Sequence, residues 1–391
     1  MNVLYISNKP VYPIIDGGCF AMAQFLNGLL SNKNISLKHL TITTKKHPFE
    51  IKEYPKEIRD QVEPEPLIIN TKITSFKALL ALIKNRAYHL DRFYNINAQK
   101  LVNSVIKNFK PDIIIIETPF LGKYIVNVPK NIKTYVRTHN VESNIWKEKH
   151  IQEKNFFKKI ILKWLTKNLK ENEIKLLNKV SGVISISNSD SNYFKSLGVS
   201  SRLTNIPPFF EINKQPKSIN KAIFFFGAMN WEPNIKALDF ILNSILPILK
   251  MEFPDIILNI GGSFNQPNHN TKDSSINFHG FVKDKNKFIS ESGILIAPIF
   301  SGSGIKIKVL EALSYGIPVI GSEKAFEGIP VKNETHAFIA KSKDEFINYC
   351  VKLFNNPNLR LEIGKKGQQF IKEHYNKQII CNQINEFISQ Q

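Results

Sequence analysis

The chain has 391 residues, of which 42% are hydrophobic and 22% charged, and its formal net charge is +20. This length predicts two domains, and the composition is typical of globular proteins with full cores, which excludes disordered, collagen-like and coiled-coil chains. The three cysteines, Cys19, Cys350 and Cys381, are widely spaced. We therefore expect no disulfide framework and no cysteine-based zinc site, and we expect a reducing cytoplasmic location. The N-terminus lacks the pattern of a signal peptide, and no apolar run is long enough to span a membrane.

The positive charge is concentrated in the N-terminal half. Residues 1–200 carry 31 Lys and Arg against 16 Asp and Glu, whereas residues 201–391 carry 22 against 17. A strongly basic balance is typical of proteins that bind nucleic acid or an anionic membrane surface. Because the chain lacks the aromatic and basic motifs of nucleic-acid-binding modules, we expect no nucleic-acid partner.

Short β-branched runs alternate with helical patterns along the whole chain. Strands are predicted at residues 2–8, 37–44, 112–117, 132–138, 182–187, 222–227, 255–262, 293–298 and 317–321. Helical patterns lie between them, for example at residues 19–31, 97–109, 234–250, 306–315 and 343–355. Several strand candidates are apolar on both faces, as buried parallel strands are. The alternation predicts an α/β protein with two doubly wound parallel sheets, divided near the Pro-, Asn- and Lys-rich segment 206–220.

Loops after strands are the first places to look for a site, because open parallel sheets bind ligands at the carboxyl ends of their strands. Asp16, Gly17 and Gly18 follow the first strand and directly precede a helical pattern. Paired glycines allow the backbone to approach a ligand closely and leave amides at the helix start. An ordinary turn would have the same sequence, so both interpretations stay open at this point.

The richest segment is residues 302–321, GSGIKIKVLEALSYGIPVIG. It follows a buried strand and predicts a helix with Lys306 in the first turn and Gly316 as its C-terminal cap. The helix dipole alone would favour an acid in the first turn, so a lysine there indicates an external anion such as a diphosphate. Glu311, deeper in the helix, can accept two hydrogen bonds from a sugar diol. The small residues expected to let the anion approach are Gly302, Ser303 and Gly304.

A third cluster directly follows the strand at residues 132–138. Arg137, His139, Asn140 and Glu142 lie within six residues of one another. A lone histidine is usually a core residue, but four polar groups at a strand end favour contact with a polyhydroxylated ligand. The spacing of Asp, Glu and His residues predicts no metal site.

Taken together, these motifs resemble those of the group 1 (family 4) glycosyltransferases of the GT-B fold. The resemblance covers essentially the whole chain and rests on motifs in a fixed order: Asp16-Gly17-Gly18, RTHNVESNIW (137–146), GVISISNSDSNYF (182–194), FFGAMNWEPNIKAL (225–238), INFHGFVKD (276–284), GSGIKIKVLEALSYGIPVI (302–320) and GKKGQQFIKEHYN (364–376).

The resemblance implies two Rossmann-like, doubly wound parallel-sheet domains that face each other across a cleft. Residues 1–210 would bind the acceptor, residues 211–375 would bind the nucleotide-sugar, and the helix at 376–391 would pack back toward the N-terminal domain. The implied reaction is retaining transfer of a sugar from a nucleoside diphosphate to a hydroxyl of a saccharide or lipid-linked acceptor. Neither a bound metal nor a cofactor is expected.

Residue roles follow from the matched motifs. The resemblance assigns Glu311 to the donor ribose, Lys306 to the diphosphate and His139 to the transferred sugar, and we predict these three residues to be catalytic. The expected donor site contains Gly17, Gly18, Gly280, Phe281, Val282, Gly302, Ser303, Gly304, Lys306, Lys308 and Glu311. The residues expected on the acceptor and sugar side are Asp16, Arg137, His139, Asn140 and Glu142.

The chain departs from the family pattern at two places. Ser303 stands where the first carboxylate of the E-x7-E motif is expected, and Ala228–Trp231 replaces a segment in which many members carry Arg and Lys. We expect Lys306 and Lys308 to substitute for those missing cations. A nucleotide-sugar epimerase on the same fold and a non-catalytic nucleotide-sugar-binding protein remain alternatives.

Residues 154–170, KNFFKKIILKWLTKNLK, predict one amphipathic helix. Its apolar stripe, Phe156 to Leu165, would normally pack on the sheet of its own domain, and this is the interpretation that we favour for the stripe. The alternative is an interfacial helix whose aromatic side chains enter a lipid headgroup region. Independently of the stripe, the lysines of the basic N-terminal half predict peripheral attachment to the inner face of the cytoplasmic membrane.

Overall fold

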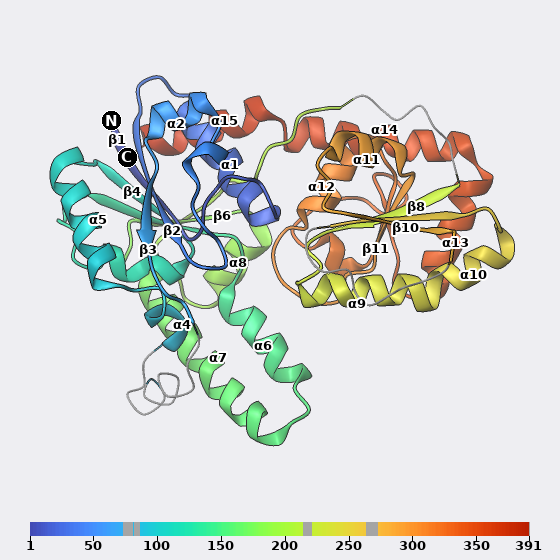
Figure 1. The fold of residues 1–391 in the computed structure, drawn as a ribbon, viewed down its shortest axis with the longest axis horizontal. Coiled ribbons are helices and arrows are strands. Elements are labelled where there is room, and N and C mark those ends of the chain that lie inside the picture. The colour runs from blue at the N-terminus through green and yellow to red at the C-terminus, as the bar shows by residue number, and fades with distance from the viewer. Residues whose placement is uncertain (73–80, 82–86, 214–220, 263–272, 391) are drawn as a thin grey trace. The chain divides into compact units, whose positions relative to one another are not determined.

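A computed structural model of the chain describes residues 1–72, 81, 87–213, 221–262 and 273–390 (Figure 1). Its residues form two compact units. Unit 1 consists of Met1–Pro208 together with Ile380–Gln391, and unit 2 consists of Phe209–Ile379. The C-terminal end of the chain therefore belongs to the same unit as its N-terminal end.

Unit 1 contains a parallel sheet of seven strands in the order β3-β2-β1-β4-β5-β6-β7. The central strand β4 is buried along its whole length, as its run of four isoleucines predicts. The strands are β1 (Asn2–Ser7), β2 (Ser36–Thr43), β3 (Glu65–Ile68), β4 (Ile113–Glu117), β5 (Lys133–Thr138), β6 (Gly182–Ser185) and β7 (Arg202–Asn205).

Helices connect these strands, as the right-handed crossovers of a parallel sheet require. The connecting helices of unit 1 are α1 (Gly17–Leu30), η1 (Ile51–Glu53), α2 (Lys56–Val62), α4 (Tyr88–Asp91), α5 (Ile96–Phe109), η2 (Pro119–Ile125), α6 (Glu142–Gln152), α7 (Phe156–Leu177) and α8 (Asn188–Ser196).

The last helix, α15 (Lys377–Ser389), packs against unit 1 through most of its length. Its Phe387 ring lies edge-on to Tyr135 of β5, with 4.8 Å between the ring centroids. A Cβ atom at Gly28 of α1 would lie 2.2 Å from Cδ1 of Ile384, so any larger residue there would require the Ile384 side chain to move. Helix α15 therefore completes the core of the N-terminal unit.

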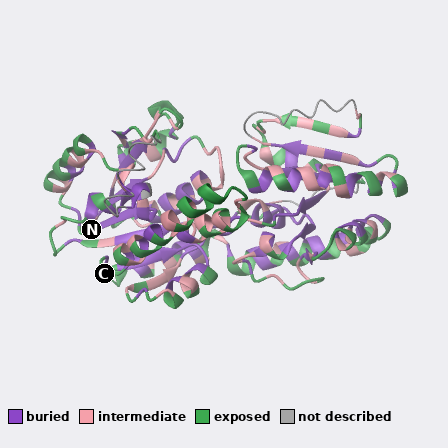
Figure 2. Cartoon of the chain, turned by 90° about the horizontal axis from the view of Figure 1, so that it is seen from below, coloured by how far each residue is buried: buried purple, intermediate pink, exposed green. Residues whose placement is uncertain are grey.

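Unit 2 contains a second parallel sheet, with six strands in the order β10-β9-β8-β11-β12-β13. Its strands are β8 (Ala222–Phe226), β9 (Ile257–Gly261), β10 (Ile276–Gly280), β11 (Ile294–Ala297), β12 (Val319–Gly321) and β13 (Phe338–Ile339). Its helices are α9 (Glu232–Phe240), η3 (Ile241–Ile245), α10 (Leu246–Glu252), α11 (Lys285–Glu291), α12 (Ile307–Ser314), η4 (Glu323–Phe326), α13 (Lys343–Asn355) and α14 (Pro357–His374). In both units the strands are mostly buried, while the helices have exposed outer faces (Figure 2).

The predicted fold class is confirmed, and all nine predicted strands are present. The prediction missed β3, β7, β10 and β13, which are the four edge strands of the two sheets. An edge strand pairs on one side only and carries more polar residues, so it lacks the continuous apolar signal of a central strand. Among the described residues, no helix combines the length and the hydropathy that crossing a membrane would require.

Candidate functional site

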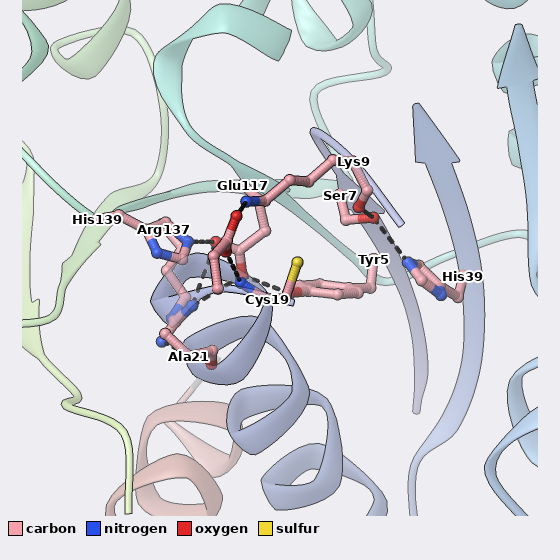
Figure 3. Close-up of polar contacts among 10 residues, drawn as sticks. Tyr5, Ser7, Lys9, Cys19, Ala21, His39, Glu117, Arg137 and His139 are labelled. Carbon is pink, nitrogen blue, oxygen red and sulfur yellow. Dashed lines mark hydrogen bonds and ion pairs between the residues drawn. The ribbon is translucent and has the colours of Figure 1, made fainter. Parts of the chain in front are cut away.

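The carboxyl ends of β1, β4 and β5 bring several polar side chains of unit 1 together (Figure 3). Strand β1 lies between β2 and β4, so the chain order along the sheet reverses at this point. Such a switch point is where open α/β sheets bind ligands. In the pairing of β4 with β5, Glu117 lies opposite Arg137, which places a carboxylate beside a guanidinium.

Arg137 and Glu117 form a fully buried ion pair. Nη1 of Arg137 donates to both carboxylate oxygens of Glu117, at 3.0 and 3.2 Å, and both side chains have an exposed fraction of 0%. The guanidinium also donates to the carbonyl of Ala21 at 3.3 Å and lies over the Phe25 ring. The prediction that Arg137 contacts an acceptor directly is therefore wrong for this conformation, because the ion pair occupies its side chain inside the core.

His139 lies at the solvent side of this pair. Its Nε2 is 2.5 Å from Oε2 of Glu117, and 12% of its side chain is exposed. Tyr5 of β1 donates its hydroxyl to the other carboxylate oxygen. Glu117 thus receives Arg137, His139 and Tyr5 at once, and His139 is the member that reaches the surface.

The charge state of Glu117 follows from these contacts. Burial alone would raise its pKa, but the charges of Arg137 and His139 and the hydrogen bonds from His139 and Tyr5 lower it to about 2. Glu117 is therefore an anion at neutral pH. The next residue, Thr118, has a φ of +72°, a conformation that a β-branched residue rarely adopts. Such strain concentrates at functional sites.

The glycine loop of unit 1 is a capped helix start. Asp16 is the N-cap of α1: it accepts from the amide of Cys19 at 2.8 Å and pairs with Lys9 at 2.5 Å. Gly17 and Gly18 are the first two residues of the helix. A Cβ atom at Gly18 would lie 3.3 Å from both Asp16 and Lys9, so glycine leaves room for the ion pair. Asp16 therefore has a structural role as the N-cap of α1, and its position directly before the helix agrees with this role.

Glu142 begins α6 beside a second buried carboxylate. Its backbone amide and that of Ser143 donate to Glu173 of α7, at 3.0 and 3.2 Å. Burial and the neighbouring Glu173 raise the pKa of Glu142 to about 8. Asn140, in the same loop, lies half-buried between His139 and α6. Of the predicted sugar-side residues, His139 and Asn140 thus lie in the loop before α6 and Glu142 begins that helix, whereas Arg137 is buried in β5.

In unit 2, the carboxyl ends of the strands carry most of the predicted donor residues. Gly227 follows β8, Gly262 follows β9, and the 302–306 loop follows β11, next to β8 in the sheet. A Cβ atom at Gly262 would lie 2.0 Å from the Gly227 carbonyl oxygen, so the two loops pass each other at backbone distance. Gly302, with a φ of +90°, passes close to Pro233 and Trp231 at the start of α9.

Lys308 extends from α12 to the end of β8. Its Nζ donates to Oδ1 of Asn234 at 2.8 Å and lies 4.1 Å from the centre of the Phe225 ring. Within the described part of the chain, no carboxylate pairs with Lys308. Burial and the neighbouring Lys306 lower its pKa to about 7. Lys308 is thus a desolvated cation close to Gly227, where the family's missing Arg and Lys were expected.

Lys306 differs from the expectation in its position. It is the N-cap residue of α12 and not a member of the first turn. Its Nζ donates to the Gly304 carbonyl at 2.6 Å and pairs with Glu327 at 3.4 Å. Because Glu327 partly neutralises Lys306, Lys308 is the better candidate for the main anion contact.

Glu311 connects α12 to the loop after β10. It is 9% exposed and pairs with Lys285 at 3.3 Å. Burial raises its pKa, although the Lys285 charge opposes this shift. Gly280, with a φ of +59°, begins the loop that precedes Lys285, and Phe281 is exposed while Val282 is half-buried. Glu311 and the Gly280–Val282 segment therefore lie on neighbouring elements, as the donor assignment requires.

Sequence reasoning missed several partners of the predicted residues, among them Glu117, Asn234, Lys285 and Glu327. Glu117 had a visible signal, since an acid ends a strand of four isoleucines and must find a partner if that strand is buried. Lys285 follows the INFHGFVKD motif directly. Nothing in the sequence connects Asn234 to Lys308 or Glu327 to Lys306, because these contacts depend on the folding of distant loops.

Comparison with known proteins agrees with this architecture. Residues 220–356, most of unit 2, match the family model of the glycosyl transferases group 1. A Klebsiella pneumoniae protein described as an uncharacterized 44.6 kDa protein in the cps region is 22% identical, with 98% of each chain covered.

Two solved structures have the same two-domain fold. Anabaena HepE, which was solved in complex with UDP and with UDP-glucose, matches with a TM-score of 0.68 and 13% identity over the whole of both chains. Sucrose-phosphate synthase from Thermosynechococcus elongatus matches with a TM-score of 0.69 and 14% identity, over 100% of this chain and 99% of the synthase. At these identities the likeness establishes the GT-B fold and not a substrate.

The buried ion pair generates a stability prediction. Glu117→Gln leaves the Arg137 guanidinium in the core without its counter-charge, and we expect the free energy of unfolding at pH 7 to fall by about 3–5 kcal/mol. The ionised form of Glu117 stabilises the fold fully above its unfolded pKa of about 4.5, and this contribution is lost as the pH falls through about 2. Urea unfolding followed by circular dichroism measures both effects.

The matched control is Glu63→Gln, at an exposed position of unit 1. Its unfolding free energy should stay within about 0.5 kcal/mol of the wild-type value. If Glu117→Gln behaved like this control, the ion pair would have no central role in unit 1.

Proposed function

We propose that this chain is a group 1 glycosyltransferase, which transfers a sugar from a nucleoside diphosphate to an acceptor hydroxyl with retention of the anomeric configuration. The observation that carries this proposal is that α12 carries both Lys308, which donates to Asn234 of α9, and Glu311, which pairs with Lys285 of α11. The UDP and UDP-glucose bound to HepE make a UDP-sugar the first donor to test.

The diphosphate would bind at the start of α12. The backbone amides there and the helix dipole favour an anion. Lys308 would supply the main positive charge, and its ammonium gains a counter-ion when the diphosphate arrives. Lys306 would contribute after partial release from Glu327, to which it is held at 3.4 Å. Together these groups would stabilise the leaving diphosphate without a bound metal.

The nucleoside would extend toward β10. Glu311 would accept hydrogen bonds from both ribose hydroxyls, and the nearby Lys285 charge opposes the rise in the pKa of Glu311 that burial causes. The backbone of Gly280–Val282 would contact the base, and the positive φ of Gly280 supports a backbone turned toward a planar ligand. These roles agree with the family resemblance of the same residues.

His139 would contact the transferred sugar. Its exposed fraction of 12% permits a hydrogen bond to a sugar hydroxyl, while Glu117 fixes the ring from behind at 2.5 Å. Glu117 would therefore be a positioning residue for His139. This arrangement fits a group that orients a substrate, which contributes to rate by proximity.

Retention would follow from attack on the face that the diphosphate leaves. The bond between the anomeric carbon and the diphosphate oxygen breaks, the acceptor oxygen bonds to the same carbon, and the acceptor proton passes to the departing phosphate oxygen. The developing diphosphate charge is balanced by Lys308 and the α12 amides. Lys308 and the α12 amides would then be sufficient to balance the negative charge that develops on the diphosphate.

The acceptor would belong to a surface polysaccharide or a lipid-linked precursor. The Klebsiella relative lies in the cps region, which supports a role in polysaccharide assembly. The 31 basic against 16 acidic residues among residues 1–200 support peripheral attachment to an anionic membrane face.

Incubation with UDP-, GDP- and ADP-sugars, with and without membrane lipid extract, tests the function. Nucleotide release that depends on an acceptor supports transfer, and an anomeric proton coupling that matches the donor supports retention. His139→Ala should lower turnover at least about 100-fold with little change in nucleotide affinity. Isomerisation of the donor without an acceptor would indicate an epimerase, and binding without any conversion would indicate a non-catalytic protein. Chelator should leave turnover unchanged.

Donor binding generates a mutational prediction. Glu311→Ala removes charge-assisted hydrogen bonds to the ribose, and Lys306→Ala removes a cation near the diphosphate. We expect each change to weaken binding of the nucleoside diphosphate by about 1.5–3 kcal/mol, measured by calorimetry. Lys283→Ala, an exposed lysine close in sequence, is the control and should change the affinity little. Unchanged affinity in both test variants would refute the donor site.

Lys308 generates a prediction about pH. With a pKa of about 7, it is mostly protonated below pH 7 and mostly neutral above it. Since a diphosphate requires the ammonium form, nucleotide affinity should fall as the pH rises from 7 to 9, by up to about tenfold per pH unit. Lys308→Met should bind more weakly and remove this pH dependence, whereas the exposed Lys287→Met should keep it. A pH-independent wild-type affinity would count against Lys308 as the phosphate contact.

A further inference from the structure

Helices α6 and α7 form a hairpin that extends away from the sheet of unit 1 (Figure 1). We call its far end, residues 147–163, the hairpin tip. We propose that the hairpin tip is an insertion surface for an anionic lipid bilayer. This inference deepens the membrane attachment proposed above and does not depend on the chemistry of the donor site.

The apolar stripe of α7 does not pack on the sheet at the hairpin tip. Phe156 and Phe157 are 70% and 75% exposed, and Ile151, Ile160 and Ile161 are exposed as well. The two phenyl rings lie edge-on to each other, 5.8 Å apart. The favoured expectation that this stripe is core is therefore wrong for its first two turns, whereas Trp164 and Leu165, farther along, are half-buried.

The base of the hairpin is fixed to unit 1. Glu173 accepts from the first amides of α6, and Leu169 packs with Trp146 and Phe120. Near the tip, a ring nitrogen of His150 lies 3.0 Å from the Lys159 carbonyl and joins the two helices. The five exposed apolar side chains therefore gather at the end of an anchored pair of helices.

The charges around these side chains identify the partner. The hairpin tip carries six lysines and only two glutamates: Lys147, Lys149, Lys154, Lys158, Lys159 and Lys163, with Glu148 and Glu153. Aromatic and aliphatic side chains surrounded by lysines fit a bilayer, where the apolar groups enter the headgroup boundary and the ammonium groups meet anionic lipid. A symmetric contact between two copies of the chain would instead bring the two lysine clusters together, which electrostatic repulsion disfavours.

The position of the hairpin relates this surface to the proposed reaction. Helix α6 begins directly after the loop that carries His139 and Asn140. Its 11 residues span about 16 Å, so a bilayer at the tip lies within reach of a headgroup-borne acceptor near His139. Membrane contact through the hairpin tip would thus present lipid-linked acceptors to the sugar-side loop.

The test is co-sedimentation of the full-length protein with vesicles of neutral phosphatidylcholine, alone or with about 30% phosphatidylglycerol. Wild type should bind the anionic vesicles in about 0.1 M salt and lose most of this binding in about 1 M salt, where the Debye length falls from about 10 to about 3 Å. Both Phe156→Ser/Phe157→Ser and Lys158→Glu/Lys159→Glu should weaken binding at least about tenfold. Because these side chains are exposed, thermal unfolding should change little.

A matched control separates local from overall charge. Lys343→Glu/Lys365→Glu makes the same change in net charge at exposed positions of unit 2 and should leave vesicle binding within about twofold. Insertion itself can be read at Phe157→Cys carrying an environment-sensitive fluorophore, since the native Cys19, Cys350 and Cys381 are buried. The label should shift to an apolar environment with anionic vesicles, and the same label at the exposed Ile68 should not.

Three results would overturn the proposal. The first is that the hairpin variants bind vesicles as tightly as the wild type, and the second is that the charge control loses as much vesicle binding as they do. The third is that the wild type self-associates and Phe156→Ser/Phe157→Ser abolishes this self-association while vesicle binding persists. The last result would assign the hairpin tip to a second copy of the chain. Transfer to a water-soluble acceptor should be unchanged in the hairpin variants, so a failure of the membrane proposal and a failure of the transferase proposal give different results.

Discussion

One buried ion pair organises the N-terminal unit. Removing Glu117 and Arg137 from water is costly, and their mutual attraction and their other hydrogen bonds offset this cost. Here the register of β4 and β5 sets the pair side by side, while α1 offers the Ala21 carbonyl and the Phe25 ring, and β1 offers Tyr5. His139 takes its orientation from this arrangement. The one surface member of the network is therefore held by three strands and a helix.

The C-terminal unit relies on a different kind of constraint. No buried ion pair of this kind lies at the carboxyl edge of its described strands, where α12 reaches three neighbouring segments through single long side chains. Lys308 extends to α9, Lys306 to Glu327, and Glu311 receives Lys285 from α11. The contact between Lys306 and Glu327 is partly exposed, so Lys306 can exchange Glu327 for an incoming anion at a smaller cost than a fully buried pair would require. Unit 1 thus fixes the orientation of the His139 side chain, whereas unit 2 keeps lysines that can bind an anion.

The sequence predicted the elements that have a continuous run of apolar residues. The central strands, such as β4 and β8, could be located because both of their faces are buried, whereas edge strands such as β10 alternate with polar residues and were missed. The position of His139 at a strand end and that of Glu311 inside a helix could also be predicted. The burial of Arg137 could not, because it depends on a cross-strand partner. Amphipathicity likewise predicts an apolar stripe on α7, but it does not predict which surface covers the stripe. In the described structure Phe156 and Phe157 stay 70% and 75% exposed.

The docking of α15 affects how the protein is made. Ile384 and Phe387 complete the core of unit 1 against Gly28 and Tyr135, yet the ribosome adds them last. Domains commonly fold as they emerge, the N-terminal one first. Unit 1 must instead wait, with apolar surface uncovered, until unit 2 has been synthesised. A premature stop codon near the end of the gene would therefore damage the first-made domain, and the cell could discard an incomplete chain before it competes for donor or acceptor.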